Sequence, residues 1–207
     1  MMKIDDTAIN AILQDTTDSQ DIKLTDIPCV DLYMDQLTTL FDDKLTSTKR
    51  NKDDKILTKT MINNYTKDKL LMPAKSKKYT KNHIILLSLI YNLKQILSIS
   101  DISILMQPIL NSLEETSNNF DLESLYSTFL NIKQDNKNRI ENDLNTQIDQ
   151  IEHLSNKLAS RNALNENLIK NSNEDLQNIL LLIFTLISEA TEKRRIAEKL
   201  IDTYFKS

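Results

Sequence analysis

The chain has 207 residues, of which 40% are hydrophobic and 27% charged, so it is long enough for one or two domains with a sizeable core. It contains no glycine and three prolines. Because glycine supplies the positive-φ turns of tight hairpins and phosphate-binding loops, its absence argues against a β-sandwich, a Rossmann unit and a P-loop. The composition therefore predicts an all-α protein whose loops are built from Asn, Asp, Ser and Lys.

Charge is distributed unevenly along the chain. Residues 1–43 hold ten Asp and two Lys, a net of −8, whereas residues 44–83 hold twelve Lys or Arg and three Asp, a net of +9. The remaining residues carry −5, which brings the whole chain to −4. A basic block between acidic segments is typical of a module that binds a polyanion. A lysine-rich solvated loop is the alternative explanation.

Several kinds of site and location are excluded or disfavoured by the sequence. The N-terminal residues lack the order of a signal peptide, and the longest apolar run, residues 179–187, is too short to span a membrane, so we expect a cytoplasmic protein. Cys29 is the single cysteine, which rules out an intrachain disulfide, and we expect it to be buried. His83, expected to be exposed, and His153 lie far apart without metal-ligand spacing. We therefore expect no cofactor, no metal and no catalysis.

The first quarter of the chain is predicted to contain one clear helix. Residues 1–25 form a polar lead-in with at most one short helix, over residues 7–13. Pro28 is expected to open a helix over residues 29–45, followed by a basic loop at 46–56. The helix has one apolar stripe with helical spacing. Its members are Val30, Tyr33, Met34, Leu37, Leu40 and Phe41.

A short helix after Thr58, its predicted N-cap, has two different sides. At 100° per residue, an apolar side is expected to face the core and a side of hydrogen-bond donors to face solvent. The apolar side holds Met61, Ile62 and Tyr65, and the donor side holds Lys59, Thr60, Asn63 and Lys67, with Asn64 at its margin. Pro73 stops any helix, and the lysines that follow it lie in a tiny hairpin or an irregular wing.

The rest of the chain is predicted to be helical. Thr80 caps a helix over residues 81–97, and Ser98 or Ser100 caps another over 101–113, which Pro108 kinks or ends early. Residues 120–158 form one long helix or two. Their apolar side chains at spacings of three or four fit a helix that lies on one neighbour, or a coiled coil. An Asn-rich loop at 160–173 precedes a last helix over 174–205, whose wide apolar stripe needs cover on more than one side.

The order of a helix, a short helix, a basic excursion and a longer helix resembles the winged helix-turn-helix domain of MerR-type transcription regulators. The resemblance covers residues 57–110, about a quarter of the chain. It is carried by Thr58, Tyr65, Leu70, Leu71, Pro73, Lys75, Lys77, Tyr79, Thr80 and the segment Ile99–Ser100–Asp101. This chain differs from that family in the long loop at 46–56 and in Asn63 and Asn64, where the family usually has Arg and Tyr.

A second resemblance spans more of the chain. The segments DIPCVDLYMDQLTTLF, LTKTMINNYTKDKLL and KKYTKNHIILL are similar to an uncharacterised family, a domain of unknown function of Gram-positive bacteria that is itself thought to be related to MerR-type domains. Together the resemblances imply three regions. These are a lead-in at 1–25, a winged helix-turn-helix domain with a minimal β-hairpin wing at 26–117, and a helical, dimerising region at 118–207.

The expected function is that of a dimeric DNA-binding transcriptional regulator. Asn63 and Asn64 can read adenine in the major groove, and basic or hydroxyl side chains can hold phosphates. The predicted DNA-binding set is Lys59, Thr60, Asn63, Asn64, Lys67, Lys75, Lys77, Lys78 and Tyr79. The bland alternative for Asn63 and Asn64 is a pair of solvated residues. A protein–protein interaction module with a degenerate winged helix is the alternative function. The resemblance also leaves a small-molecule effector open, although residues 118–207 identify no pocket.

Overall fold

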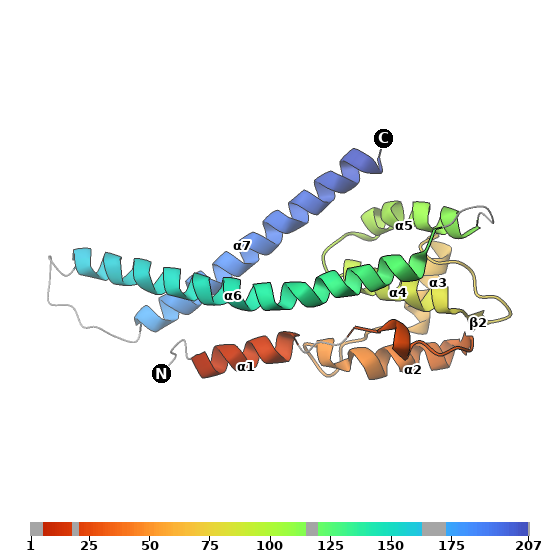
Figure 1. Ribbon diagram of the computed structural model, residues 1–207, viewed down its shortest axis with the longest axis horizontal. Helices are drawn as coiled ribbons and strands as arrows, with labels where there is room; N and C mark the ends of the chain where they lie inside the picture. The colour runs from red at the N-terminus through yellow and green to blue at the C-terminus, as the bar shows by residue number, and fades with distance from the viewer. Residues whose placement is uncertain (1–5, 18–20, 115–119, 163–172, 207) are drawn as a thin grey trace. The chain divides into compact units, whose positions relative to one another are not determined.

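A computed structural model describes residues 6–17, 21–114, 120–162 and 173–206 (Figure 1). These residues are mostly helical and carry one two-stranded antiparallel sheet. They form two compact units, the first from residues 1–17 and 134–193 and the second from 18–133 and 194–207. Residues 118–207, expected as one region, therefore contribute to both units.

Seven α-helices, two 3-10 helices and two strands are present in the described parts of the chain. The α-helices are α1 (Asp6–Thr17), α2 (Met34–Leu45), α3 (Lys59–Lys67), α4 (Lys81–Leu93), α5 (Ile99–Glu114), α6 (Leu122–Asn162) and α7 (Asn173–Tyr204). The 3-10 helices are η1 (Leu24–Asp26) and η2 (Thr46–Thr48), and the strands are β1 (Leu32–Tyr33) and β2 (Lys78–Tyr79). No helix among the described residues is long and apolar enough to cross a membrane.

The start of α2 corrects the sequence prediction. A helix was expected from residue 29, but α2 begins at Met34, where the backbone N–H of Tyr33 donates to the Gln36 side chain at 2.9 Å. The two preceding residues form β1, which pairs with β2 through Leu32 with Tyr79 and Tyr33 with Lys78. Strand pairing holds this segment extended, so the expected helical stripe is shortened. Val30 is consequently 70% exposed. Cys29, predicted to be buried, is exposed as well.

Helix α4 lies at the centre of the second unit and between α2 and α5 in the view of Figure 1. Nearly every side chain from its third residue to its tenth is buried, which agrees with its predicted apolar character. The buried residues are His83, Ile84, Ile85, Leu86, Leu87, Ser88 and Ile90. They join one hydrophobic core that also includes Leu37 and Phe41 of α2, Ile62 of α3 and Ile102 of α5. Burial of such side chains contributes about 1.5–3 kcal/mol each, so α4 is the main source of cohesion in this unit.

The boundaries of α4 and α5 differ from those predicted at 81–97 and 101–113. Helix α4 ends at Leu93. The ammonium group of the next residue, Lys94, donates a hydrogen bond to the Ile56 carbonyl at 2.9 Å. Burial lowers the pKa of this lysine. Ser98 is the N-cap of α5, because its hydroxyl accepts from the Asp101 backbone N–H at 3.1 Å. Pro108 lies inside α5 and does not end it.

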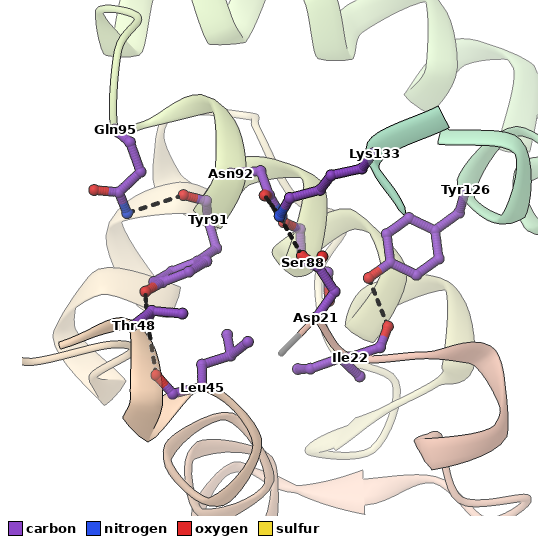
Figure 2. Close-up of polar contacts among 10 residues, drawn as sticks. All are labelled: Asp21, Ile22, Leu45, Thr48, Ser88, Tyr91, Asn92, Gln95, Tyr126 and Lys133. Carbon is purple, nitrogen blue, oxygen red and sulfur yellow. Dashed lines mark hydrogen bonds and ion pairs between the residues drawn. The ribbon is translucent and has the colours of Figure 1, made fainter. Parts of the chain in front are cut away.

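Polar contacts fix the start of the second unit to α4 and α6 (Figure 2). The hydroxyl of Tyr126, which is fully buried, donates to the Ile22 carbonyl at 2.7 Å. Burial raises the pKa of Tyr126 to about 12, so the phenol stays protonated and remains a donor. Lys133 bridges the Asp21 carboxylate at 2.6 Å and the Asn92 side chain at 2.9 Å. Residues more than a hundred positions apart in sequence are therefore joined by hydrogen bonds.

The first unit consists of α1 and parts of α6 and α7. Its core is small and contains Leu13, Leu144, Ile148, Ile151 and Leu182. Polar bonds join α6 to α7, from Gln147 to Glu189 at 2.5 Å and from Ser155 to Asn178 at 2.6 Å. Helix α1 is longer than predicted. Helix α6 is one continuous helix, and most of the predicted Asn-rich loop lies outside the described residues.

His83 was expected to be exposed, but it is 2% exposed in the first turn of α4. Its Nδ1 accepts from the Thr80 backbone N–H at 3.1 Å, so the ring caps the helix that carries it. The other ring nitrogen therefore carries the proton and donates to the Pro73 carbonyl at 3.3 Å. Burial lowers the pKa of His83 from its ordinary 6.5, because a charged ring would lose its hydration. The neutral ring thus joins α4 to the segment before β2.

His83 should make the stability of the protein depend on pH in the mildly acidic range. Because the folded chain binds the His83 proton less readily than the unfolded chain, the His83 contribution to the free energy of unfolding should be fully present above about pH 6.5 and be lost as the pH falls below it. His83→Gln should flatten this dependence in urea unfolding measured at several pH values. Asn82→Gln provides the control, because it alters the neighbouring position of α4 without removing an ionisable group, and it should leave the slope as in the unaltered protein. Equal slopes for all three proteins would contradict the assignment.

The bond from Tyr126 to Ile22 should be measurable as stability. Tyr126→Phe leaves a buried carbonyl without its donor, and we expect a loss of about 1–3 kcal/mol in the free energy of unfolding from urea titration, with an unchanged m-value. Tyr204→Phe is the matched control, because Tyr204 is 71% exposed and should lose nothing measurable. A loss of the same size in both variants would show that the buried hydroxyl has no special role.

Candidate nucleic-acid interface

Helix α3 has the two sides that the sequence predicts. Thr58 is its N-cap, and the Thr58 hydroxyl accepts from the Met61 backbone N–H at 3.1 Å. Ile62 and Tyr65 are buried, at 0% and 7% exposure, and hold the helix on the core. The residues of the predicted donor side are all exposed. They are Lys59, Thr60, Asn63, Asn64 and Lys67.

The end of α3 is a tight reversal made without glycine. Lys69 adopts a left-handed conformation with φ of 57°. The N–H of Leu70 bonds to the Tyr65 carbonyl at 2.8 Å, and the N–H of Lys69 bonds to the Thr66 carbonyl at 3.2 Å. This is the Schellman arrangement, in which glycine usually takes the left-handed position. The buried Leu70 then returns the chain to the core, so the Lys69 side chain is left exposed at the end of the helix.

A second tight reversal, the lysine turn (residues 75–78), precedes β2. Lys75 and Lys78 exchange backbone hydrogen bonds of 2.9 and 3.1 Å. The two residues between them, Ser76 and Lys77, have φ of 50° and 63°. Two left-handed residues between paired positions define a type I′ hairpin turn, where Asn-Gly is the usual sequence. Left-handed conformations cost non-glycine residues about 1–2 kcal/mol each, so this turn is held by its surroundings at a cost in stability.

The β1–α2 junction connects α3 with the lysine turn. Lys78 pairs with Tyr33 in the sheet, and its ammonium group lies 5.3 Å from the centroid of the Tyr33 ring. Two residues further along, the Asp35 carboxylate forms an ion pair with Lys59 at the start of α3. Lys59 and Lys78 therefore both contact one short segment, residues 33–35. From Lys59, the positions of Asn63 and Lys67 follow at four-residue steps along the exposed side of α3.

The lysines of the predicted set differ in whether their charge is already paired within the protein. Lys67, Lys75 and Lys77 are exposed and form no salt bridge within the described part of the chain. Lys78 is half-buried over the tyrosine ring, and the Lys59 charge is shared with Asp35. The most available cations are therefore those of the lysine turn and of the end of α3.

Tyr79 is a correction to the predicted set. Its side chain is 5% exposed and packs edge-on against the His83 ring, with ring centroids 5.4 Å apart. Burial raises the pKa of the Tyr79 phenol. Successive side chains of a strand point to opposite faces, so the Tyr79 ring points into the core while Lys78 points away from it. We had expected the Tyr79 hydroxyl to contact a phosphate. Tyr79 therefore packs in the core directly after the lysine turn.

Two residues near this surface were missed by the sequence analysis. Lys69 adds an exposed cation at the end of α3, and Asp35 adds a competing anion at its start. A glycine-free chain must place other residues in its left-handed turns, which was the available signal for Lys69. The contact of Asp35 with Lys59 depends on the pairing of β1 with β2, and a strand of two residues cannot be recognised in the sequence. The described residues include no group of three or more His, Cys, Asp or Glu side chains that could hold a metal ion.

Comparison with known proteins gives one result that bears on identity. No curated protein and no solved structure matches the chain. The family model of a domain of unknown function (DUF1836) matches residues 22–129, slightly more than half of the chain. The match begins at the residue bonded by Tyr126 and includes α3, the lysine turn and α4, in agreement with the resemblance to an uncharacterised family. The chain therefore belongs to the DUF1836 family.

Proposed function

We propose that the protein is a dimeric, cytoplasmic, DNA-binding transcriptional regulator with a MerR-like winged helix-turn-helix, and that it binds its target without catalysis. In this proposal α3 is the recognition helix and the lysine turn is the wing. The observation that carries it is that both elements contact the β1–α2 junction: Lys59, on the exposed donor side of α3, forms an ion pair with Asp35, and Lys78, at the end of the lysine turn, pairs with Tyr33.

The recognition helix supplies groups suited to both bases and phosphates. Asn63 is exposed in the middle of α3, and an asparagine side chain can bond adenine through two hydrogen bonds in the major groove. Asn64 adjoins it. Lys59, Thr60 and Lys67 lie at the ends of the same exposed side, where they can bond phosphates that flank the read bases. The buried Ile62 and Tyr65 fix the helix, so these side chains are presented from a rigid support.

The lysine turn is suited to backbone contacts. Its paired ends and left-handed centre hold the Lys75 and Lys77 backbones in one geometry, so little conformational freedom remains to be lost on binding. Neither lysine forms a salt bridge within the described residues, so binding of phosphate need not break an existing ion pair. Most of the expected affinity is electrostatic and therefore sensitive to salt.

Charge reversal in the wing tests this proposal. If a dimer makes about six phosphate contacts, the logarithm of the binding constant should fall with the logarithm of salt concentration at a slope of about −5. Lys75→Glu with Lys77→Glu removes two contacts from each chain, so the slope should shrink toward about −2 and binding should be lost at moderate salt. Fluorescence anisotropy with labelled duplex DNA at several salt concentrations measures both quantities.

The control carries the same charge change elsewhere in the basic block. Lys52→Glu with Lys55→Glu alters two exposed lysines of the loop before α3 and should retain most of the affinity. Equal loss in both double variants would show a general effect of net charge and remove the wing from the model. Absence of binding to any duplex at low salt would favour the alternative function, a protein–protein interaction module with a degenerate winged helix.

The dimer is proposed to form through α7. Its first half carries an exposed apolar stripe at spacings of four, three, one and three residues, formed by Leu176, Leu180, Ile183, Phe184 and Ile187. Leu182 is 6% exposed and packs in the core of the first unit, on a different side of the helix. Burying ten such side chains between two copies would contribute on the order of 10–20 kcal/mol, enough to exceed the cost of association.

Charges placed on this stripe should separate the subunits. Ile183→Glu with Ile187→Glu should halve the mass measured by light scattering at micromolar concentration, because each charge would be buried without a partner in the dimer. Lys193→Glu changes the net charge by the same two units at an exposed position well away from the stripe and should leave the mass unchanged. A dimeric mass for the stripe variant would mean that another surface joins the subunits.

A further inference from the structure

The second unit contains an apolar cavity that the proposed function does not use. Its volume is about 430 Å³, and its walls come from four segments of the chain. Leu89 and Leu93 of α4 form one wall, Met106 and Ile109 of α5 form the next, and Phe129 of α6 and Phe205 after α7 complete it. This volume lies in the range of small-molecule sites, about 300–1,000 Å³.

The lining has a distinct chemical character. Among the described residues that line the cavity, Ser112 on α5 is the only one with a polar side chain, and none is charged. Three aromatic rings contribute, from Phe120, Phe129 and Phe205. Aromatic rings favour ligands that offer another ring in an edge-to-face or offset arrangement. A charged molecule would lose its hydration in such a site without compensation, whereas an apolar aromatic molecule would not.

The C-terminal residues cover one side of this cavity. The N–H of Phe205 bonds to the Ile201 carbonyl at 3.0 Å, which continues the line of α7. The next residue, Lys206, reaches the Asp101 carboxylate of α5 at 3.4 Å and the Asp202 carboxylate at 2.7 Å. Exposed ion pairs of this kind contribute little stability, so the cover is weakly held. The Phe205 side chain is 45% exposed and is not among the side chains packed against the hydrophobic core.

The hollow is partly open to solvent, because Phe120, Leu125 and Phe205 of its lining are 36%, 42% and 45% exposed. A hollow of this volume lined by hydrophobic and aromatic side chains is typical of small-molecule sites. Its walls come from α4, α5, α6 and the C-terminal residues, so it is not a long groove between two parallel elements of the kind in which a partner helix lies. This arrangement suits a compact ligand.

We propose that this cavity is a binding site for a small, uncharged, mainly aromatic molecule, with the Ser112 hydroxyl as its one hydrogen-bonding group and Phe205 as its cover. Most of its lining lies before residue 118, outside the C-terminal helical region. It stands independently of DNA binding, because its walls share no residue with the exposed side of α3 or with the lysine turn.

Filling the cavity tests this proposal in the full chain. The probe is N-phenyl-1-naphthylamine, an uncharged aromatic compound whose fluorescence rises on entering an apolar site. Ser112→Phe places a ring in the cavity and should weaken probe binding at least tenfold while leaving the unfolding midpoint unchanged or higher. Asn111→Phe is the matched control, since it adds the same ring to the exposed neighbouring position on α5 and should bind the probe as the unaltered protein does.

A second variant guards against failure of Ser112→Phe to fold. Phe205→Ala removes the cover and should speed probe dissociation severalfold in stopped-flow measurements, whereas Tyr204→Ala, at the exposed adjacent position, should not. Equal probe affinity in Ser112→Phe and Asn111→Phe, or equal dissociation rates in the two tail variants, would overturn the proposal. A change of mass in light scattering for Ser112→Phe, with unchanged probe affinity, would assign the cavity to a second copy of the chain and overturn it too.

Discussion

Burial of α4 is the constraint on which the second unit depends. Its side chains are buried over most of the helix, so the elements around it must present apolar surfaces to it: α2 with Phe41, α3 with Ile62 and α5 with Ile102. The two polar groups that α4 buries are both satisfied, since His83 caps its own helix and Ser88 bonds the Ile84 carbonyl at 2.8 Å. An uncompensated polar group at either place would cost about 1–3 kcal/mol.

The absence of glycine has a structural consequence at the proposed interface. Both reversals that frame the exposed lysines use non-glycine residues in left-handed conformations, Lys69 after α3 and Ser76 with Lys77 in the lysine turn. Each of these left-handed residues lowers the stability of the fold relative to a glycine at the same position. What the chain gains is three side chains on the outside of tight turns, two of them cations. His83 contributes by binding the Pro73 carbonyl, which ties the segment leading to the turn to the first turn of α4.

Much of this arrangement follows from the sequence, and the exceptions have physical causes. The spacing of Ile62 and Tyr65 after a threonine cap predicts both the extent of α3 and its exposed side, because burial and capping are local. Strand β1 could not be predicted, since two residues that pair with β2 lie inside an apolar pattern with helical spacing. His83 was misjudged because its burial depends on a carbonyl ten residues away. The apolar stripe of α7 was predicted to need cover on more than one side, and its side chains are 39–61% exposed in the single chain.

Nuclear magnetic resonance of the nitrogen-15-labelled protein with a short duplex tests the central claim most directly, because it reports on each backbone amide. If α3 and the lysine turn bind DNA, the largest shift changes should fall on residues 59–67 and 75–78, with the buried amides of α4 nearly unmoved. They should disappear as salt is raised. Changes confined to α7, or no changes at low salt, would contradict a nucleic-acid interface at α3 and leave the helical fold with a different partner.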